Sequence, residues 1–207
     1  MSPADRARTP WGTISRDRIV DAAAQVVATE GSERLSIRRL ASDLGVAPMS
    51  LYRHVRGKDE VLEAVVDRLL AETWEPAARH EDWRAWITDA AERLRSLLIS
   101  QPAALHVYLR HPVVSPAAVA RMTAMMEVLR SGMGSEDAAR RAYAAIHTYT
   151  LGFSALEAAR AGGDAAAGNA GDLAHELAAF TSGRQFSEGL GYLLDGISND
   201  ANRETTR

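Results

Sequence analysis

Apolar residues recur along the chain at intervals of three and four, the period of an α-helix, and no stretch alternates with the period of a β-strand. In the segment 16–30 these positions form one face, made of Ile19, Ala22, Ala23, Val26 and Val27. Ser15 precedes the segment as a helix N-cap, and Gly31 follows it as a C-terminal glycine. The pattern predicts an amphipathic helix here and an all-α fold for the whole chain.

The segment 35–58 has the pattern of two short helices joined by a tight turn. Ser36 is placed to cap the first helix, Gly45 can supply the positive φ of the turn, and Pro48 is tolerated at the start of the second helix. The inward-facing apolar residues are Ile37, Leu40, Ala41, Leu44, Val46, Leu51 and Val55. Together with the helix at 16–30, this segment predicts a three-helix unit containing a helix-turn-helix.

The rest of the chain is also predicted to be helical, with segments at 59–74, 83–100, 103–111, 116–132, 135–161, 172–180 and 183–198. The small, glycine-rich stretch 161–171 reads as a mobile connection. We expect three parts, namely a flexible arm over 1–14, a helix-turn-helix domain over 15–72 and a C-terminal helical domain over 73–207.

Composition places the chain among globular proteins, because 46% of its 207 residues are hydrophobic and 25% are charged. It contains no cysteine, which excludes disulfides and thiolate metal sites. No run approaches the roughly 18 apolar residues of a membrane span, and nothing resembles a signal peptide. We therefore expect a cytoplasmic protein without a membrane partner.

Charge is divided unevenly along the chain. Residues 1–58 hold ten Arg and Lys against six Asp and Glu, a sum of +4, whereas the remaining residues hold fourteen against twenty-one, a sum of −7. A basic head on an acidic body indicates that the head meets a polyanion. Arg6 and Arg8 in the arm either reach a DNA minor groove or belong to a disordered tail.

The second helix of the 35–58 segment presents small, polar and basic residues outward. Short side chains at its start permit close approach to thymine methyl groups, and arginine can form a bidentate contact with guanine. Hydroxyl, imidazole and ammonium groups can donate to phosphate oxygens. The predicted DNA-contacting residues are Ser36, Arg38, Arg39, Pro48, Met49, Ser50, Tyr52, Arg53, His54 and Lys58. The alternative is an ordinary helical hairpin with a solvated charged face.

The run LSIRRLASDLGVAPMSLYRHVRGKDEVLEAVVDRLL, at 35–70, closely resembles the DNA-binding domain of TetR-family transcriptional regulators. Its features are the capped basic helix, the LGV turn, the LYxHV helix and the KxxL start of the next helix. The resemblance covers about residues 15–72. It implies DNA contacts from the outward residues above and a moving role for the helix at 58–74, which would link the DNA-binding head to the body.

The spacing of Trp83, RHPVV at 110–114 and HTYTLGFSALEAA at 147–159 also resembles the C-terminal domain of the tetracycline-repressor branch. The resemblance implies a homodimer held by a four-helix bundle from the long helix and the last helix. Residues expected at that interface are Ala145, Gly152, Phe153, Leu156, Phe186, Leu190 and Leu194. The alternative is that these residues form only an intrachain core.

A ligand site between the body helices should be mostly apolar with a few polar anchors. The candidate lining residues are Trp74, Trp86, Leu94, His106, Tyr108, Met122, Met125, Met126, His147 and Tyr149. The alternative is that the methionines are core residues and the histidines structural.

Tetracycline repressors bind a magnesium–drug chelate through histidines, and Trp74 and Tyr108 fall where two of those histidines would be expected. We therefore expect no cofactor or metal in this protein, and a different, bulky and largely apolar effector.

No nucleophile, metal or phosphate motif of a common enzyme class is present, so we do not expect an enzyme. The sequence predicts a DNA-binding transcriptional regulator, most simply a homodimeric repressor that a small effector releases from a palindromic operator. The alternative function is a helical ligand-binding or adaptor protein that no longer binds DNA.

Overall fold

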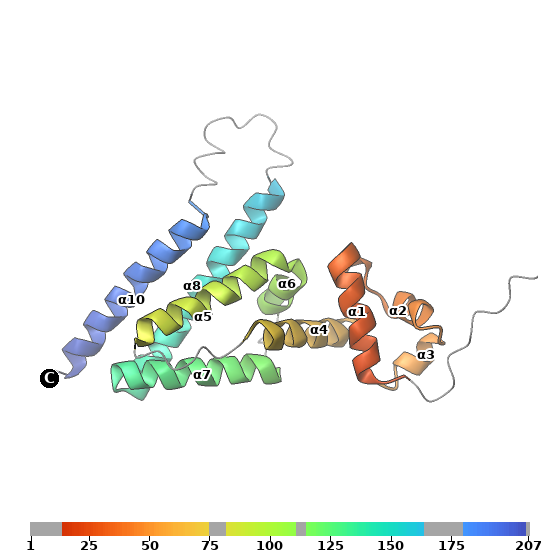
Figure 1. The fold of residues 1–207 in the computed structure, drawn as a ribbon, viewed down its shortest axis with the longest axis horizontal. Coiled ribbons are helices and arrows are strands. Elements are labelled where there is room, and N and C mark those ends of the chain that lie inside the picture. Colours follow the sequence, from red (N-terminus) through yellow and green to blue (C-terminus); the bar gives the residue numbers. More distant parts are fainter. Residues whose placement is uncertain (1–13, 75–81, 111–114, 164–179, 206–207) are drawn as a thin grey trace, which may run out of the picture. The chain divides into compact units, whose positions relative to one another are not determined.

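The computed structural model describes residues 14–74, 82–110, 115–163 and 180–205, and its regular elements there are helices without strands (Figure 1). The predicted all-α fold is confirmed. The helices are α1 (Arg16–Glu30), α2 (Ile37–Asp43), α3 (Pro48–Leu51), α4 (Lys58–Thr73), α5 (Trp83–Ser100), α6 (Pro102–Arg110), α7 (Pro116–Met133), α8 (Glu136–Gly163) and α10 (Gly183–Thr205), with a 3-10 turn at Ser32–Arg34. Three predicted segments lie largely outside the described residues. They are the arm over 1–14, of which residues 1–13 are not described, the glycine-rich connection over 161–171 from residue 164 on, and the helix over 172–180 up to residue 179.

The chain divides into two compact units, Met1–Leu69 and Leu70–Arg207, and the division falls within α4. The predicted domain boundary, after residue 72, lies in the same helix. In the part of the chain that the structure describes, no helix is long and apolar enough to cross a membrane.

Helix starts follow the capping residues of the sequence. At six of them the side-chain oxygen of the preceding residue accepts a hydrogen bond from a backbone N–H in the first turn, and these caps are Ser15, Ser36, Asp82, Ser115, Ser135 and Ser182. Each such bond satisfies a donor that has no partner within the helix. Gly45 ends the α2 turn with φ of 68°, as the turn prediction requires.

The N-terminal unit closes around a small apolar core contributed by α1 to α4, which includes Ile19, Ala23, Leu40, Ala41, Leu51, Val55, Val61 and Val65. Ion pairs at the surface join α1 to α4: Arg16 reaches Glu60 at 3.4 Å, and Arg68 pairs with Asp21. Because α2 and α3 pack over this base, the turn between them is held at a fixed angle to α1.

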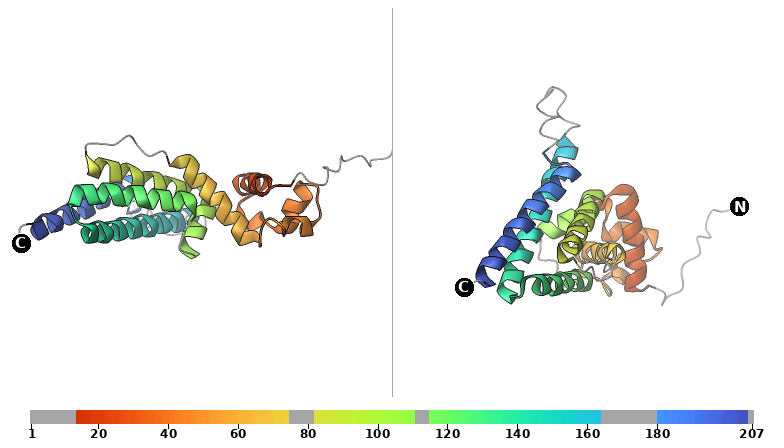
Figure 2. Two further views of the ribbon diagram at one scale, coloured as in Figure 1. Left: turned by 90° about the horizontal axis from the view of Figure 1, so that it is seen from below. Right: turned by 60° about the vertical axis from the view of Figure 1, so that its left-hand side comes forward.

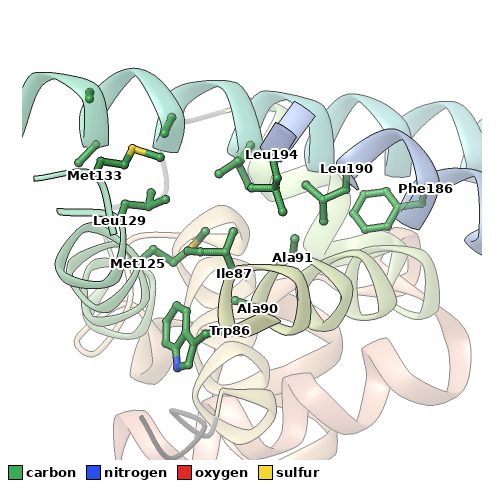
Figure 3. Packing of buried hydrophobic residues seen from close by; sticks show 14 residues of the cluster. Trp86, Ile87, Ala90, Ala91, Met125, Leu129, Met133, Phe186, Leu190 and Leu194 are labelled. Atoms are coloured by element: carbon green, nitrogen blue, oxygen red, sulfur yellow. The ribbon is translucent and has the colours of Figure 1, made fainter. Parts of the chain in front are cut away.

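The C-terminal unit is built from α5, α7 and α8, which pack on one another around a single buried cluster. The last helix, α10, lies along α8 and also contacts α5 (Figure 2). It inserts Phe186, Leu190 and Leu194 into the same cluster, opposite Ile87 and Ala91 of α5 (Figure 3). The apolar stripe of α10 is therefore used inside the chain.

Candidate DNA-binding surface and effector site

One side of α3, the second helix of the helix-turn-helix, is buried in the N-terminal unit, and the other side is exposed. Leu51 is fully buried, while Met49 is 74% and Tyr52 49% exposed. Met49 and Tyr52 are therefore accessible for contact with a partner molecule. Arg53, which follows directly, is exposed as well.

The other predicted DNA-binding residues lie in the same compact unit as α3. Ser36, Arg38 and Pro48 are exposed, and Ser50, His54 and Lys58 are half-buried. The Ser36 hydroxyl oxygen accepts the N–H of Arg39 at 3.1 Å, and Lys58 is the first residue of α4. All of these residues are therefore at least partly accessible on the N-terminal unit.

Arg39 has a further role that the sequence reading missed. Its guanidinium donates to both carboxylate oxygens of Asp43, at 3.1 and 2.9 Å, and to Glu30 at 2.8 Å. Hydrogen bonds from Asp43 and then Glu30 raise the pKa of Arg39 above its ordinary value. Arg39 therefore ties α2 to the end of α1, and a DNA contact would draw it from these carboxylates.

Aromatic residues from α5, α6, α8 and the residue after α4 meet in the C-terminal unit. The rings of Trp74 and Trp86 stand edge to face with centroids 5.5 Å apart. His147 stacks on Tyr143 at 5.4 Å and lies 6.2 Å from Tyr108. Four predicted pocket residues, Trp74, Trp86, Tyr108 and His147, thus belong to one region.

Arg121 of α7 lies in this region and was not among the predicted site residues. It is 4% exposed, donates from its guanidinium to the Ala90 carbonyl at 3.2 Å, and lies 5.6 Å from the Trp74 ring. Burial lowers its pKa, while Tyr108 and Tyr143 act in the opposite direction. The burial of Arg121 could have been predicted from the sequence. Arg121, Met125 and Leu129 follow one another at intervals of four residues, which places them on the same buried face of α7.

His147 carries a buried Nδ1 with no hydrogen-bond partner among the described residues. Burial, and then the charge of Arg121, lower the pKa of His147. The imidazole is therefore neutral at pH 7. An unsatisfied buried polar atom costs about 1–3 kcal/mol, which a bound group with matching chemistry would recover.

The remaining predicted pocket residues are dispersed. Leu94 and Met125 are buried, and His106 and Met122 are exposed. Met126 and Met122 line an open pocket of about 540 Å³ along α7 and α8. Tyr149 faces α10, where its hydroxyl donates to the Phe186 carbonyl at 3.0 Å.

The residues predicted for a dimer interface fall into two groups. Phe186, Leu190 and Leu194 are buried within the chain, as in the intrachain alternative. Leu156 is 56% exposed, Gly152 is exposed with open space around it, and Ala145 and Phe153 are half-buried. Exposed Tyr192 of α10 was not predicted.

The chain matches two family models that together span most of its length. Residues 19–65 match "Bacterial regulatory proteins, tetR family", and residues 75–200 match "Tetracyclin repressor-like, C-terminal domain". The chain belongs to the TetR family. This membership confirms the resemblance read from the sequence, including that to the tetracycline-repressor branch, and TetR-family regulators are not enzymes.

Relatives within the TetR family agree with this assignment. The chain is 37% identical over 132 residues to the HTH-type transcriptional repressor DrrR1 of Streptomyces coeruleorubidus, covering 63% of this chain and 48% of that repressor. The chain spans about half the length of the first curated relatives that it matches. The class A tetracycline repressor from transposon 1721 in Escherichia coli is 27% identical over 203 residues, covering 89% of this chain and 91% of that one.

Solved structures of TetR-family proteins share the fold. Apo ActR from Streptomyces coelicolor superposes with a TM-score of 0.77 at 26% identity, covering 92% of this chain and 98% of ActR. ActR in complex with actinorhodin gives a TM-score of 0.74, also at 26% identity, covering 90% and 96%. No group of three or more His, Asp or Glu side chains within the described ranges is arranged to hold a metal ion.

Proposed function

We propose that this protein is a cytoplasmic, homodimeric transcriptional repressor that a small, largely apolar effector releases from a palindromic operator. The observation that carries the proposal is the exposure of Met49 and Tyr52 on a short helix held by the α2–α3 turn. Membership of the TetR family supports a role in transcriptional regulation, and one curated relative is a transcriptional repressor.

On this proposal α3 enters the major groove with its N-terminal end toward the bases. Met49 contacts apolar base edges, Tyr52 donates to phosphate, and Arg53 pairs with phosphate or guanine. Ser36, Arg38 and Lys58 add contacts that fix the position of the head on the backbone.

A single head reads too short a sequence to select one operator, which is why we propose a homodimer with two copies of α3 in successive major grooves. Leu156 and Tyr192 are exposed apolar or aromatic side chains on α8 and α10, and Gly152 permits close helix approach. We place the partner subunit on these two helices. Repression then follows from covering the promoter.

We place the effector in the aromatic region around Trp74, Trp86, Tyr108 and His147, because aromatic walls with few polar groups are typical of small-molecule sites. ActR, a structural relative, has been solved with actinorhodin. That precedent supports a small-molecule effector for the present chain. Binding beside Trp74, the residue after α4, would act on the helix that enters the DNA-binding unit.

Gel retardation with the DNA upstream of the protein's own gene tests the proposal. Each lost DNA contact weakens binding by about 1–3 kcal/mol, so Tyr52→Ala and Arg53→Ala should each lower operator affinity by about fivefold to more than a hundredfold. Arg130→Ala, which removes an exposed arginine of α7, outside both the DNA-binding unit and the two helices proposed for the dimer, is the matched control for direct DNA contact. Full operator affinity in both α3 variants, or no retardation by the wild type, would favour the ligand-binding or adaptor alternative.

A further inference from the structure

Two arginines of the C-terminal unit, the half-buried Arg95 and the buried Arg121, lie against aromatic rings, and they differ in their counter-ions. Arg95 lies 5.4 Å from the Phe186 ring and forms a two-pronged ion pair with Glu157, at 2.9 and 2.5 Å. Arg121 lies 5.6 Å from the Trp74 ring and is more deeply buried, yet no Asp or Glu in the described ranges forms an ion pair with it. Within the described ranges its guanidinium donates a hydrogen bond to the neutral carbonyl of Ala90.

A buried guanidinium without a carboxylate carries a large desolvation cost that a neutral carbonyl offsets only in part. The group has five N–H donors in a planar fork that matches a carboxylate. We propose that Arg121 is the anchor for an acidic group on the effector, which makes the effector an aromatic carboxylic acid. This inference rests on the proposed function, because it takes the occupant of the region to be the effector.

The surroundings of Arg121 specify the rest of the ligand. Trp74 stands against the guanidinium, and Tyr143, whose ring stacks on His147, is close enough to interact electrostatically with Arg121. The buried Nδ1 of His147 offers a second polar contact. A flat ring system with an acid group at one end satisfies all of these: the carboxylate pairs with Arg121, the ring packs on the aromatic faces, and a polar substituent meets the imidazole.

The same geometry connects the acid group to the rest of the protein. Trp74 directly follows α4, and its ring now occupies one side of the guanidinium. A carboxylate competes with that ring for Arg121, so an acidic effector changes the packing at the end of α4 and a neutral analogue leaves it in place.

The test is isothermal titration calorimetry of the full-length protein with 2-naphthoate and its neutral, nearly isosteric amide, 2-naphthamide. The wild type should bind 2-naphthoate at least tenfold more tightly than 2-naphthamide. Arg121→Met should reduce this ratio to near one, and Arg121→Lys, which keeps the charge but loses the fork, should give an intermediate ratio. Arg130→Met is the matched control, because Arg130 lies on the same helix but is exposed and paired with Glu136.

Circular dichroism melting shows whether each variant is folded. If Arg121→Met does not fold, the lysine variant still decides the question. Equal binding of the two compounds by the wild type, failure of both to bind, or an unchanged ratio in the folded Arg121 variants would each overturn the proposal.

The failure of this inference is distinguishable from failure of the proposed function. If 2-naphthoate selectivity depends on Arg121 but the protein does not retard its upstream DNA, the anion site stands and the repressor proposal falls. If the DNA is retarded and the acid is not preferred, only the acidic effector is excluded.

Discussion

Replacing Gly45 with alanine tests whether the turn that presents α3 depends on a conformation reserved for glycine. The φ of Gly45 is 68°, and a Cβ built there meets no heavy atom within 4 Å. Any cost is therefore conformational and not steric. Placing an L-residue in the left-handed region costs about 1–2 kcal/mol, and the reduced entropy of the unfolded chain returns about 0.5 kcal/mol. We expect Gly45→Ala to destabilise the N-terminal unit by about 1 kcal/mol.

Two further variants separate this cause from a general effect of removing glycine. Asparagine tolerates the left-handed region, so Gly45→Asn should lose less stability than Gly45→Ala. Gly57 also has open space around it but has no positive φ, so Gly57→Ala should change the stability by less than 0.5 kcal/mol, a value typical of surface sites. The three variants should rank with Gly45→Ala the least stable.

Native-state amide hydrogen exchange is the suitable assay, because the chain has two compact units that need not unfold together. The turn is closed by the N–H of Val46, which donates to the Ala41 carbonyl at 2.9 Å. Exchange in peptides covering α2 and α3 should accelerate about fivefold in Gly45→Ala, the factor that 1 kcal/mol represents, and operator affinity should fall with it. If Gly45→Ala exchanges no faster than Gly57→Ala, the role assigned to the positive φ is wrong.

Two other predictions concern the C-terminal unit. The pKa of His147 is lowered in the folded state, so the unfolded chain binds more protons below about pH 6.5, and the free energy of unfolding should fall as the pH drops from 7 to 5. His147→Phe should make this fall shallower in urea denaturation across that range, and an unchanged pH dependence would contradict the lowered pKa. Gly152→Ala should raise the melting temperature of the monomer, because alanine favours the helix by up to about 1 kcal/mol and the added methyl group has open space around it. The same substitution should weaken a dimer in which the partner helix packs against Gly152. Sedimentation equilibrium measures the second effect, and an unaltered dimer constant would exclude Gly152 from the interface.

The sequence alone was sufficient to predict structural features that depend only on neighbouring residues. Ser15, Ser36 and Asp82 start helices because an oxygen in the N-cap position satisfies a backbone donor nearby, whatever the rest of the chain does. The positive φ at Gly45 follows from the tight turn in the same way. The exposure of α3 also follows from the pattern, since Leu51 is its inward residue.

Features that depend on which distant segments meet were harder to predict. The helical period placed Phe186 on an apolar face but did not say whether that face meets α5 and α8 of the same chain or another subunit. Arg121 was overlooked because arginine is rarely buried, although its spacing matched the buried stripe of α7. Tyr143 was also missed, because its ring contact depends on the orientation of His147 one turn along α8.

The factor by which the effector lowers operator affinity limits how the effector can act. Lowering operator affinity a hundredfold requires the effector to prefer the released state by about 2.7 kcal/mol, since a ligand shifts an equilibrium only by its difference in affinity. A hydrogen-bonded contact to a charged group contributes about 1.5–3 kcal/mol, so one carboxylate on Arg121 is sufficient if the contact forms fully in one state and not in the other. An acid that reached Arg121 equally well in both states would bind tightly and release nothing. Trp74 is the group placed to make that difference, because it stands against the guanidinium and directly follows α4. Trp74→Ala should therefore reduce the effect of the effector on operator binding by more than the loss of effector affinity measured in calorimetry accounts for.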